Sequence, residues 1–117
     1  MSYVVVARYL TLPGKVAEVL GLLDTMAEAS RQEPGNRQYR VHQGAEDPRT
    51  VVLYEEYDAE ADFTAHCASE HFQRIVLGAV VPLLESRDVV RLTSRTGASG
   101  ASGASGASGA SGEEVSA

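Results

Sequence analysis

The chain has 117 residues, of which 44% are hydrophobic and 22% are charged, and its net charge is -6 at pH 7. This length and composition fit one globular domain and leave no room for a second core. The acidic balance and the scattered basic residues argue against nucleic acid or an anionic membrane as a partner.

Cys67 is the single cysteine, which excludes an internal disulfide and a cysteine-based metal cage. A lone cysteine is consistent with a reducing cytoplasm, where we expect the protein to be located. The first residues carry no basic segment typical of a secretory signal. The longest uncharged apolar run, Ile75 to Leu84, is interrupted by Pro82 and is too short to span a membrane.

The composition changes sharply near residue 95. Gly97 is followed by five copies of Ala-Ser-Gly that end at Gly112, and these residues have no side chains able to bury much area. We expect residues 1–95 to form the domain and residues 96–117 to form a flexible Ala-Ser-Gly-rich tail, either native or engineered. About 95 residues is small for an isolated core, so oligomerisation is expected.

The first half of the domain predicts a strand followed by a long helix. Residues Tyr3 to Leu12 are rich in Val and Tyr and end at Pro13-Gly14, which is typical of a strand followed by a turn. From Lys15 to Gln32 apolar residues recur every three or four positions, which predicts an amphipathic helix. Glu33-Pro34-Gly35 ends this helix, because a residue before proline avoids helical angles.

The second half predicts a hairpin, two short helices and a last strand. Asp58 and Ser69 are candidate caps for the two helices. In chain order the predicted elements are strand Tyr39 to Gln43, strand Thr50 to Asp58, helix Ala59 to Cys67, helix Glu70 to Val80 and strand Val89 to Thr93. The complete order is that of an α+β, ferredoxin-like βαββαβ split unit, with an antiparallel sheet carrying its helices on one face.

The strand pattern also predicts an assembly. Val4 and Val6 point to one side of the first strand and Val5 to the other, so both faces are apolar, and the third strand repeats this pattern. Helices cover only one face. We therefore expect a homodimer in which a second copy packs its sheet against the uncovered face, the alternative being a monomer with an exposed apolar sheet.

Glu55 is the first candidate for chemistry. It shares a strand face with Val51, Leu53 and Tyr57, so a carboxylate lies in an otherwise apolar row, whereas Glu56 points to the opposite face. A buried carboxylate needs a partner. The alternative is that this strand end reaches solvent and both acids are hydrated.

Three histidines are the second candidates, because histidine exchanges protons near neutral pH. His42 lies on the second strand, while His66 and His71 flank the junction of the two short helices. All three are expected to surround one end of the layer between sheet and helices. A structural or surface role is the alternative for each of them.

Metal and nucleophile sites receive less support. His66 and His71 are five residues apart across a helix break, so they do not form a His-Glu-x-x-His motif, and a site of two histidines with Glu55 is a weak alternative. Cys67 and its neighbour His66 point in different directions on a helix, so a small buried side chain is expected. No glycine-rich loop indicates a nucleotide or another organic cofactor.

Several segments occur together in an order that resembles the antibiotic biosynthesis monooxygenase family of dimeric α+β barrel proteins. The resemblance covers about residues 3 to 94. The segments that carry it are Glu33 to Tyr39, Tyr39 to His42, Asp47-Pro48, Leu53 to Tyr57, Ala65-His66 and Ser69 to Phe72.

This resemblance implies a homodimer whose subunits oxidise an electron-rich aromatic, such as a quinol, an anthrone or a polyketide-type phenol, to a quinone with O2 and without a bound cofactor or metal. Such chemistry needs a base, hydrogen bonds to the substrate anion and a dry pocket. By position, His42 or His66 would be the base and Glu55 would orient a histidine or the substrate hydroxyl. The substrate-binding residues implied in this way are Tyr39, Tyr57, His71 and Phe72.

The sequence also departs from branches of this family. It has no Trp and its first strand has no Asn, which argues against the haem-degrading branch, and some quinone-forming members use a Trp near the substrate. An isomerase or cyclase acting on a small ketone would use the same acid-base groups. A dimer that binds a small molecule without chemistry is the non-enzymatic alternative.

Overall fold

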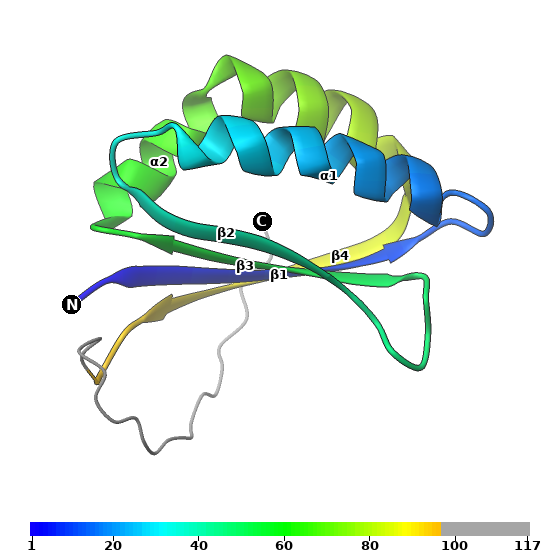
Figure 1. Ribbon diagram of the computed structural model, residues 1–117, viewed down its shortest axis with the longest axis horizontal. Helices are drawn as coiled ribbons and strands as arrows, with labels where there is room; N and C mark the ends of the chain where they lie inside the picture. Colours follow the sequence, from blue (N-terminus) through cyan, green and yellow to red (C-terminus); the bar gives the residue numbers. More distant parts are fainter. Residues whose placement is uncertain (97–117) are drawn as a thin grey trace.

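The computed structural model describes residues 1–96, in which four strands form one antiparallel sheet with the order β2-β3-β1-β4 (Figure 1). The two central strands are therefore the first and third along the chain. The strands are β1 Tyr3–Thr11, β2 Asn36–Gln43, β3 Thr50–Tyr57 and β4 Leu84–Thr93.

The helices lie together on one face of this sheet, and the other face is left open (Figure 1). They are α1 Val16–Arg31, α2 Glu60–Ala68 and η1 Phe72–Val80, which is wound as a π-helix and is followed by a single 3-10 turn, η2 Val81–Leu83. Pro82 lies in that turn, where the chain leaves the helix for β4. The predicted ferredoxin-like fold is confirmed.

Each central strand has an apolar side chain on both faces. Val5 and Leu53 point towards the helices and are 1% exposed, whereas Val6, Val52 and Tyr54 point to the open face and are half-buried. This alternation agrees with the predicted pattern. An apolar stripe therefore runs across the open face, over the two central strands.

Two strands begin earlier than predicted. The strand predicted from Tyr39 starts at Asn36, with a register shift between Asn36 and Gln38. The strand predicted from Val89 starts at Leu84 and pairs with β1 as far as Thr11. Both are edge strands in which the second and third residues are polar and exposed, Arg37 and Gln38 in β2 and Glu85 and Ser86 in β4, so hydrophobic alternation does not mark where they begin.

The two predicted helix caps had different outcomes. Ser69 acts as predicted, since its hydroxyl accepts a hydrogen bond from the backbone N–H of Phe72. Asp58 does not cap α2; it accepts a hydrogen bond from Arg37 at 2.6 Å, and Asp62 instead reaches back to the backbone N–H of Ala59 at 3.1 Å. The carboxylate of the first helical turn therefore replaces the expected cap.

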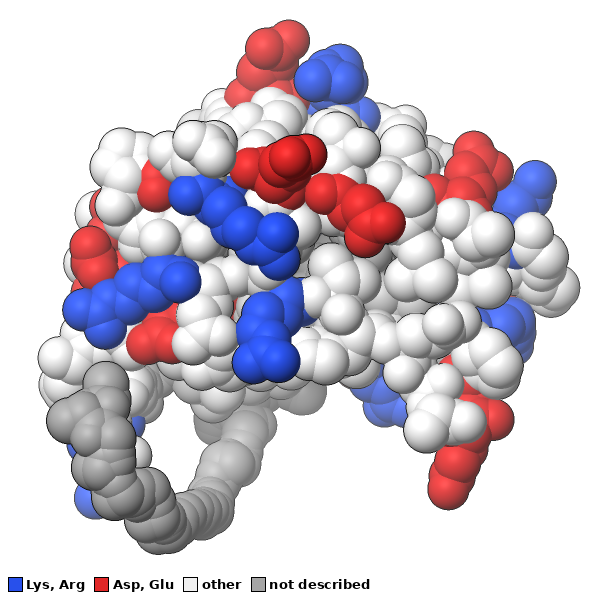
Figure 2. All heavy atoms as spheres, viewed as in Figure 1, with Lys and Arg blue, Asp and Glu red and all other residues white. Residues whose placement is uncertain are grey.

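The two ends of the described chain meet, because the backbone N–H of Ser94 donates to the carbonyl of Ser2 at 2.9 Å. The predicted tail, residues 96–117, lies outside the described residues except for Thr96. No helix within residues 1–96 is long and apolar enough to cross a membrane. On the face seen in Figure 2, acidic and basic side chains are intermixed, as the scattered charges of the sequence predict.

A substitution at Gly35 tests how tightly the α1–β2 connection packs on α2. A Cβ at this position would overlap the Asp62 side chain, which would have to leave the backbone N–H of Ala59. We expect Gly35→Ala to lower the free energy of unfolding by about 1–3 kcal/mol in urea denaturation. The control is Gly21→Ala, where a Cβ meets nothing within 4 Å and a small gain in stability is expected; equal effects of both changes would contradict this packing.

Candidate active site

The candidate site is centred on a carboxyl group inside the protein. Glu55 on β3 pairs in register with Val5 of β1 and Tyr39 of β2, and it is only 4% exposed. The strand period carries it to the helix-covered face with Val51, Leu53 and Tyr57, all of which are buried. The prediction that Glu55 is the internal acid is confirmed, and Glu56 lies on the open face.

Burial controls the protonation of Glu55. The loss of hydration raises its pKa to about 7, and the charge of Glu33 acts in the same direction, while a hydrogen bond from the Tyr57 hydroxyl at 2.7 Å acts against them. That bond ends on Oε1. In the neutral acid the proton is therefore carried by Oε2, so Glu55 can donate a hydrogen bond near neutral pH.

His66 lies beside Glu55, on the face of α2 that packs on the sheet. It is 2% exposed, and its Nε2 is 3.8 Å from Oε1 of Glu55, which is longer than a hydrogen bond. Burial lowers the pKa of His66 below its ordinary value of 6.5, and the carboxylate of Glu33 partly offsets this. His66 is therefore neutral at pH 7 and able to accept a proton.

Glu33 joins both helix-junction histidines. Its Oε1 lies 3.0 Å from Nδ1 of His66 and its Oε2 lies 2.5 Å from Nε2 of His71. Glu33 comes from the connection between α1 and β2, and its side chain is 17% exposed. The structure thus brings His66 and His71 together, as expected, through the carboxylate of Glu33, a residue to which the sequence assigned no role in the site.

Aromatic rings surround His66. The ring centroids of Tyr57 and Phe72 lie 5.5 Å and 5.3 Å from that of His66, and that of Tyr39 lies at 5.9 Å. Tyr39 and Tyr57 are fully buried, and burial raises the pKa of both hydroxyls. Three of the four predicted substrate-binding residues therefore surround one imidazole, and Phe72 is the only one of these three that is half-buried.

His42 is placed elsewhere, so the expectation that all three histidines surround one end of the layer is wrong. It pairs in register with Val52 on the open face, and it is exposed. Its Nδ1 lies 3.3 Å from the carbonyl oxygen of Val52. The reason is strand parity: Tyr39 and His42 are three residues apart, and residues separated by an odd number point to opposite faces.

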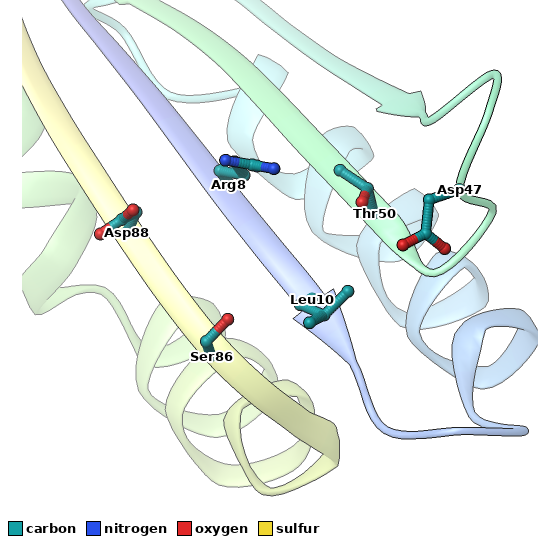
Figure 3. A pocket seen from close by; sticks show the side chains of 6 residues that line it. All are labelled: Arg8, Leu10, Asp47, Thr50, Ser86 and Asp88. Carbon is teal, nitrogen blue, oxygen red and sulfur yellow. The ribbon is translucent and has the colours of Figure 1, made fainter.

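Two hollows lie on the open face. One, of about 460 Å³, is lined by His42 with Val6, Gln38, Arg40, Val52 and Tyr54. The other, of about 220 Å³, is shown in Figure 3, with the helices behind the sheet. Its lining residues are Arg8, Leu10, Asp47, Thr50, Ser86 and Asp88. Neither hollow is lined by the residues around Glu55.

Glu33, His66 and His71 have ligand atoms within 4.8 Å of one another, a spacing at which three groups can approach one metal ion. The carboxylate of Glu33 already accepts an imidazole N–H from each histidine, so these atoms satisfy one another without an ion. We therefore treat the trio as a hydrogen-bonded cluster. It differs from the sequence-based alternative, which combined the histidines with Glu55.

Sequence reasoning missed Glu33 and Tyr9. Tyr9 of β1 is 4% exposed, and burial together with the nearby charge of Glu55 raises its pKa. Its alternation with Val5 and Ala7 on β1 would have placed it on the same face as Glu55. Glu33 offered one signal, an acid directly before Pro-Gly at the helix end, but nothing local indicates histidine partners so distant in the chain.

The arrangement is a buried acid-base pair. His66 presents an acceptor at Nε2, Glu55 presents a carboxyl group that titrates near neutral pH, and tyrosine hydroxyls lie around them. Such a pair can take a proton from a weak acid and hold the resulting anion by hydrogen bonds. Cys67 is no nucleophile here, because burial raises the pKa of its thiol to about 11.

Comparison with known proteins defines the class. Residues 2–76 match the family model described as antibiotic biosynthesis monooxygenase, and the chain belongs to that family. The curated relative "Putative monooxygenase YcnE" of Bacillus subtilis (strain 168) is 33% identical over 79 residues, which cover 68% of this chain and 83% of YcnE.

Solved structures agree with this assignment. Rv0793 from Mycobacterium tuberculosis is 27% identical with a TM-score of 0.77, over 84% of this chain and 99% of Rv0793. A "putative antibiotic biosynthesis monooxygenase" from Nitrosomonas europaea is 28% identical with a TM-score of 0.75, over 80% of this chain and 89% of that one. The predicted family is confirmed, with the fold that its members share.

The raised pKa of Glu55 predicts a pH-dependent stability. Because the pKa is about 7 in the folded state and 4.5 is its ordinary value, the folded protein binds this proton more tightly than the unfolded chain. The stability contributed by Glu55 is therefore complete below pH 4.5 and is lost as the pH rises through 7. We expect Glu55→Gln to gain about 3 kcal/mol in unfolding free energy, relative to the parent, between pH 4.5 and pH 8.

Urea denaturation at the two pH values measures this difference directly. The matched control is Glu28→Gln, the same chemical change at an exposed position of α1. Taking differences from the parent removes the contribution of His66, which has the opposite sign. A Glu55→Gln difference that stays constant from pH 4.5 to 8 would contradict the buried, proton-binding carboxyl group.

Proposed function

We propose that the protein is a cofactor-independent monooxygenase that oxidises an electron-rich aromatic, a quinol, an anthrone or a polyketide-type phenol, to a quinone with O2. The observation that carries this proposal is the buried pair of Glu55 and His66, enclosed by aromatic rings in a chain of this family. The family supports oxygenase chemistry. The pair supplies what such chemistry requires of the protein, a base and a hydrogen-bond donor away from water.

The reaction begins with proton removal by His66. Its Nε2 takes the proton of the substrate, and the imidazolium that forms is stabilised by the Glu33 carboxylate at Nδ1. The substrate anion gives one electron to O2, and the substrate radical and superoxide combine to form a peroxide anion at carbon. This anion takes the proton back from the His66 imidazolium and becomes a hydroperoxide. Loss of water then leaves the carbonyl of the quinone, with one oxygen atom in the product and one in the water. All electrons come from the substrate, so no external reductant is needed.

Glu55 acts as the hydrogen-bond donor to the substrate anion. Its carboxyl group is neutral below about pH 7 and carries its proton on Oε2, because Oε1 accepts the Tyr57 hydroxyl. A neutral acid stabilises a developing oxyanion without adding a second negative charge. Tyr39, Tyr57 and Phe72 pack the substrate ring, and His71 lies at the edge of the site.

The substrate enters from the side of Phe72 and His71, the half-buried residues around His66. Tyr39 and Tyr57 are closed off by the sheet and cannot serve as the entrance. A ring-sized ligand therefore requires Phe72 to move aside. This is the least costly opening, because Phe72 lies at the start of η1, beside the break at Ser69 that separates η1 from α2.

Oxygen uptake tests the proposed function. The metal-stripped protein is mixed with a reduced anthrone or naphthoquinol in an oxygen electrode, and we expect turnover that falls at least about a hundredfold in His66→Gln. His42→Gln is the matched control and should keep full activity, since His42 lies on the open face. Equal activity of the parent and His66→Gln would reject His66 as the base.

The same assay separates the other functions of this fold. Turnover of a ketone under argon would indicate an isomerase or cyclase that uses the same acid-base pair. An aromatic that binds but is recovered unaltered after long exposure to O2 would indicate a binding protein. Strict dependence on O2 with a quinone product supports the monooxygenase.

The pH profile of kcat/KM is expected to be bell-shaped. Activity rises as His66 loses its proton, which occurs below pH 6.5, and falls near pH 7 as Glu55 becomes an anion. Glu55→Gln keeps a hydrogen-bond donor that does not ionise, so its profile should lose the alkaline limb and keep the acid limb. An alkaline limb unchanged by Glu55→Gln would show that another group controls it.

We further propose that the protein works as a homodimer joined through the open face of the sheet. The half-buried apolar stripe of Val6, Val52 and Tyr54 supports this, because apolar sheet faces of this kind are usually covered. We expect Val6→Arg to convert a dimer into a monomer in sedimentation equilibrium. The exposed helix substitution Glu28→Arg is the control and should leave the mass unchanged; a monomeric parent protein would reject the dimer.

A further inference from the structure

The side chain of Glu33 contacts two histidines, and these contacts are not explained by its place at the end of a helix. Its two carboxylate oxygens divide between two histidines, with Oε1 on His66 and Oε2 on His71. The histidines themselves lie on different helical segments, and the first is buried while the second is 24% exposed at its side chain. One carboxylate from the α1–β2 connection therefore holds together two rings from the helix junction.

The contact with Glu33 determines which nitrogen of His66 carries the proton. A carboxylate only accepts hydrogen bonds, so Nδ1 must be the N–H donor towards Glu33. The neutral ring then has its lone pair on Nε2. That atom faces Glu55 at 3.8 Å, inside the site, and it is not consumed by a direct hydrogen bond.

His71 in turn fixes Glu33. With one oxygen held by Nε2 of His71, the carboxylate cannot rotate freely away from Nδ1 of His66. His71 lies in the first turn of the helical segment that contains Phe72, so its backbone is held by secondary structure. The imidazole of His66 is thus fixed through two successive hydrogen bonds that lead from the interior to the surface.

We propose that Glu33 is a positioning residue, held by His71, which fixes His66 as the Nδ1–H tautomer and directs its Nε2 lone pair into the site. Its effect on catalysis rests on the proposed function. Its effect on the imidazole does not, since the tautomer is a property of the protein without substrate. Charged and titratable groups around His66 are Glu33, His71, Glu55, Tyr39 and Tyr57.

The direct test is the tautomer of His66, read from the nitrogen shifts of its imidazole in long-range proton-nitrogen NMR spectra of the ligand-free protein. The parent is expected to show Nδ1–H. Glu33→Ala removes the acceptor and should shift the ring towards Nε2–H, the form that solvent-exposed histidine prefers. Glu70→Ala, the loss of an exposed carboxylate beside His71, is the control and should leave the spectrum unchanged.

The variant Glu33→Gln separates the effect of Glu33 on the orientation of the His66 imidazole from the effect of its negative charge. It also replaces Glu33→Ala as the test if that variant does not fold. The amide oxygen of Gln can accept the Nδ1–H of His66, so the tautomer is expected to remain, while the titration of His66 moves to lower pH because the negative charge is gone. His71→Ala should loosen the arrangement and give a mixture of tautomers. His71→Gln can donate to Glu33 again, and it should restore the single form.

Activity supplies the second readout. Glu33→Ala should lower kcat by about tenfold to a hundredfold with little change in KM, and Glu33→Gln should lower kcat by a smaller factor. If the tautomer shifts in Glu33→Ala but no variant and no parent protein consumes O2, the inference stands and the proposed function fails. If His66 keeps Nδ1–H in a folded Glu33→Ala variant, the inference is overturned, whatever the activity.

Discussion

The structure depends on one carboxyl group that folding removes from water. Glu55 lies in the central strand β3 between apolar neighbours, and the cost of burying its charge is met by keeping the proton and by the hydrogen bond from Tyr57. A hydrocarbon side chain at this position would pack without this cost. The buried carboxyl group of Glu55 therefore lowers the stability of the folded protein above neutral pH. In return, it provides a group that can exchange a proton while shielded from solvent.

The second constraint is how the helices are joined. A break at Ser69 separates α2 from the next helical segment, so His66 and His71 approach one carboxylate instead of following one helix face. Glu33 reaches them because α1 ends directly above β2. Two connections between regular elements thus determine the chemistry of the site, while the sheet supplies its rigid floor.

The sequence predicted those features of the fold and of the candidate site that depend on local periodicity. Alternation placed Glu55 inside and Glu56 outside, and the helix break placed His66 near His71. It failed for His42, although the odd spacing from Tyr39 already separated the two faces of β2. It could not assign Glu33 its partners, which lie 33 and 38 residues away, because such contacts depend on how the layers pack and not on any local pattern.

The hydrogen bond between Ser94 and Ser2 has a practical consequence. Tyr3 pairs with both Tyr57 and Thr93, so the first and last of the described residues 1–96 lie at the end of the sheet that also carries the site. The hairpin between β2 and β3 lies at the opposite end. A fluorophore or surface attachment placed at Glu46 would therefore stand away from the buried histidine. A circular permutant of residues 2–94 opened there could join Ser2 and Ser94 by a short bridge.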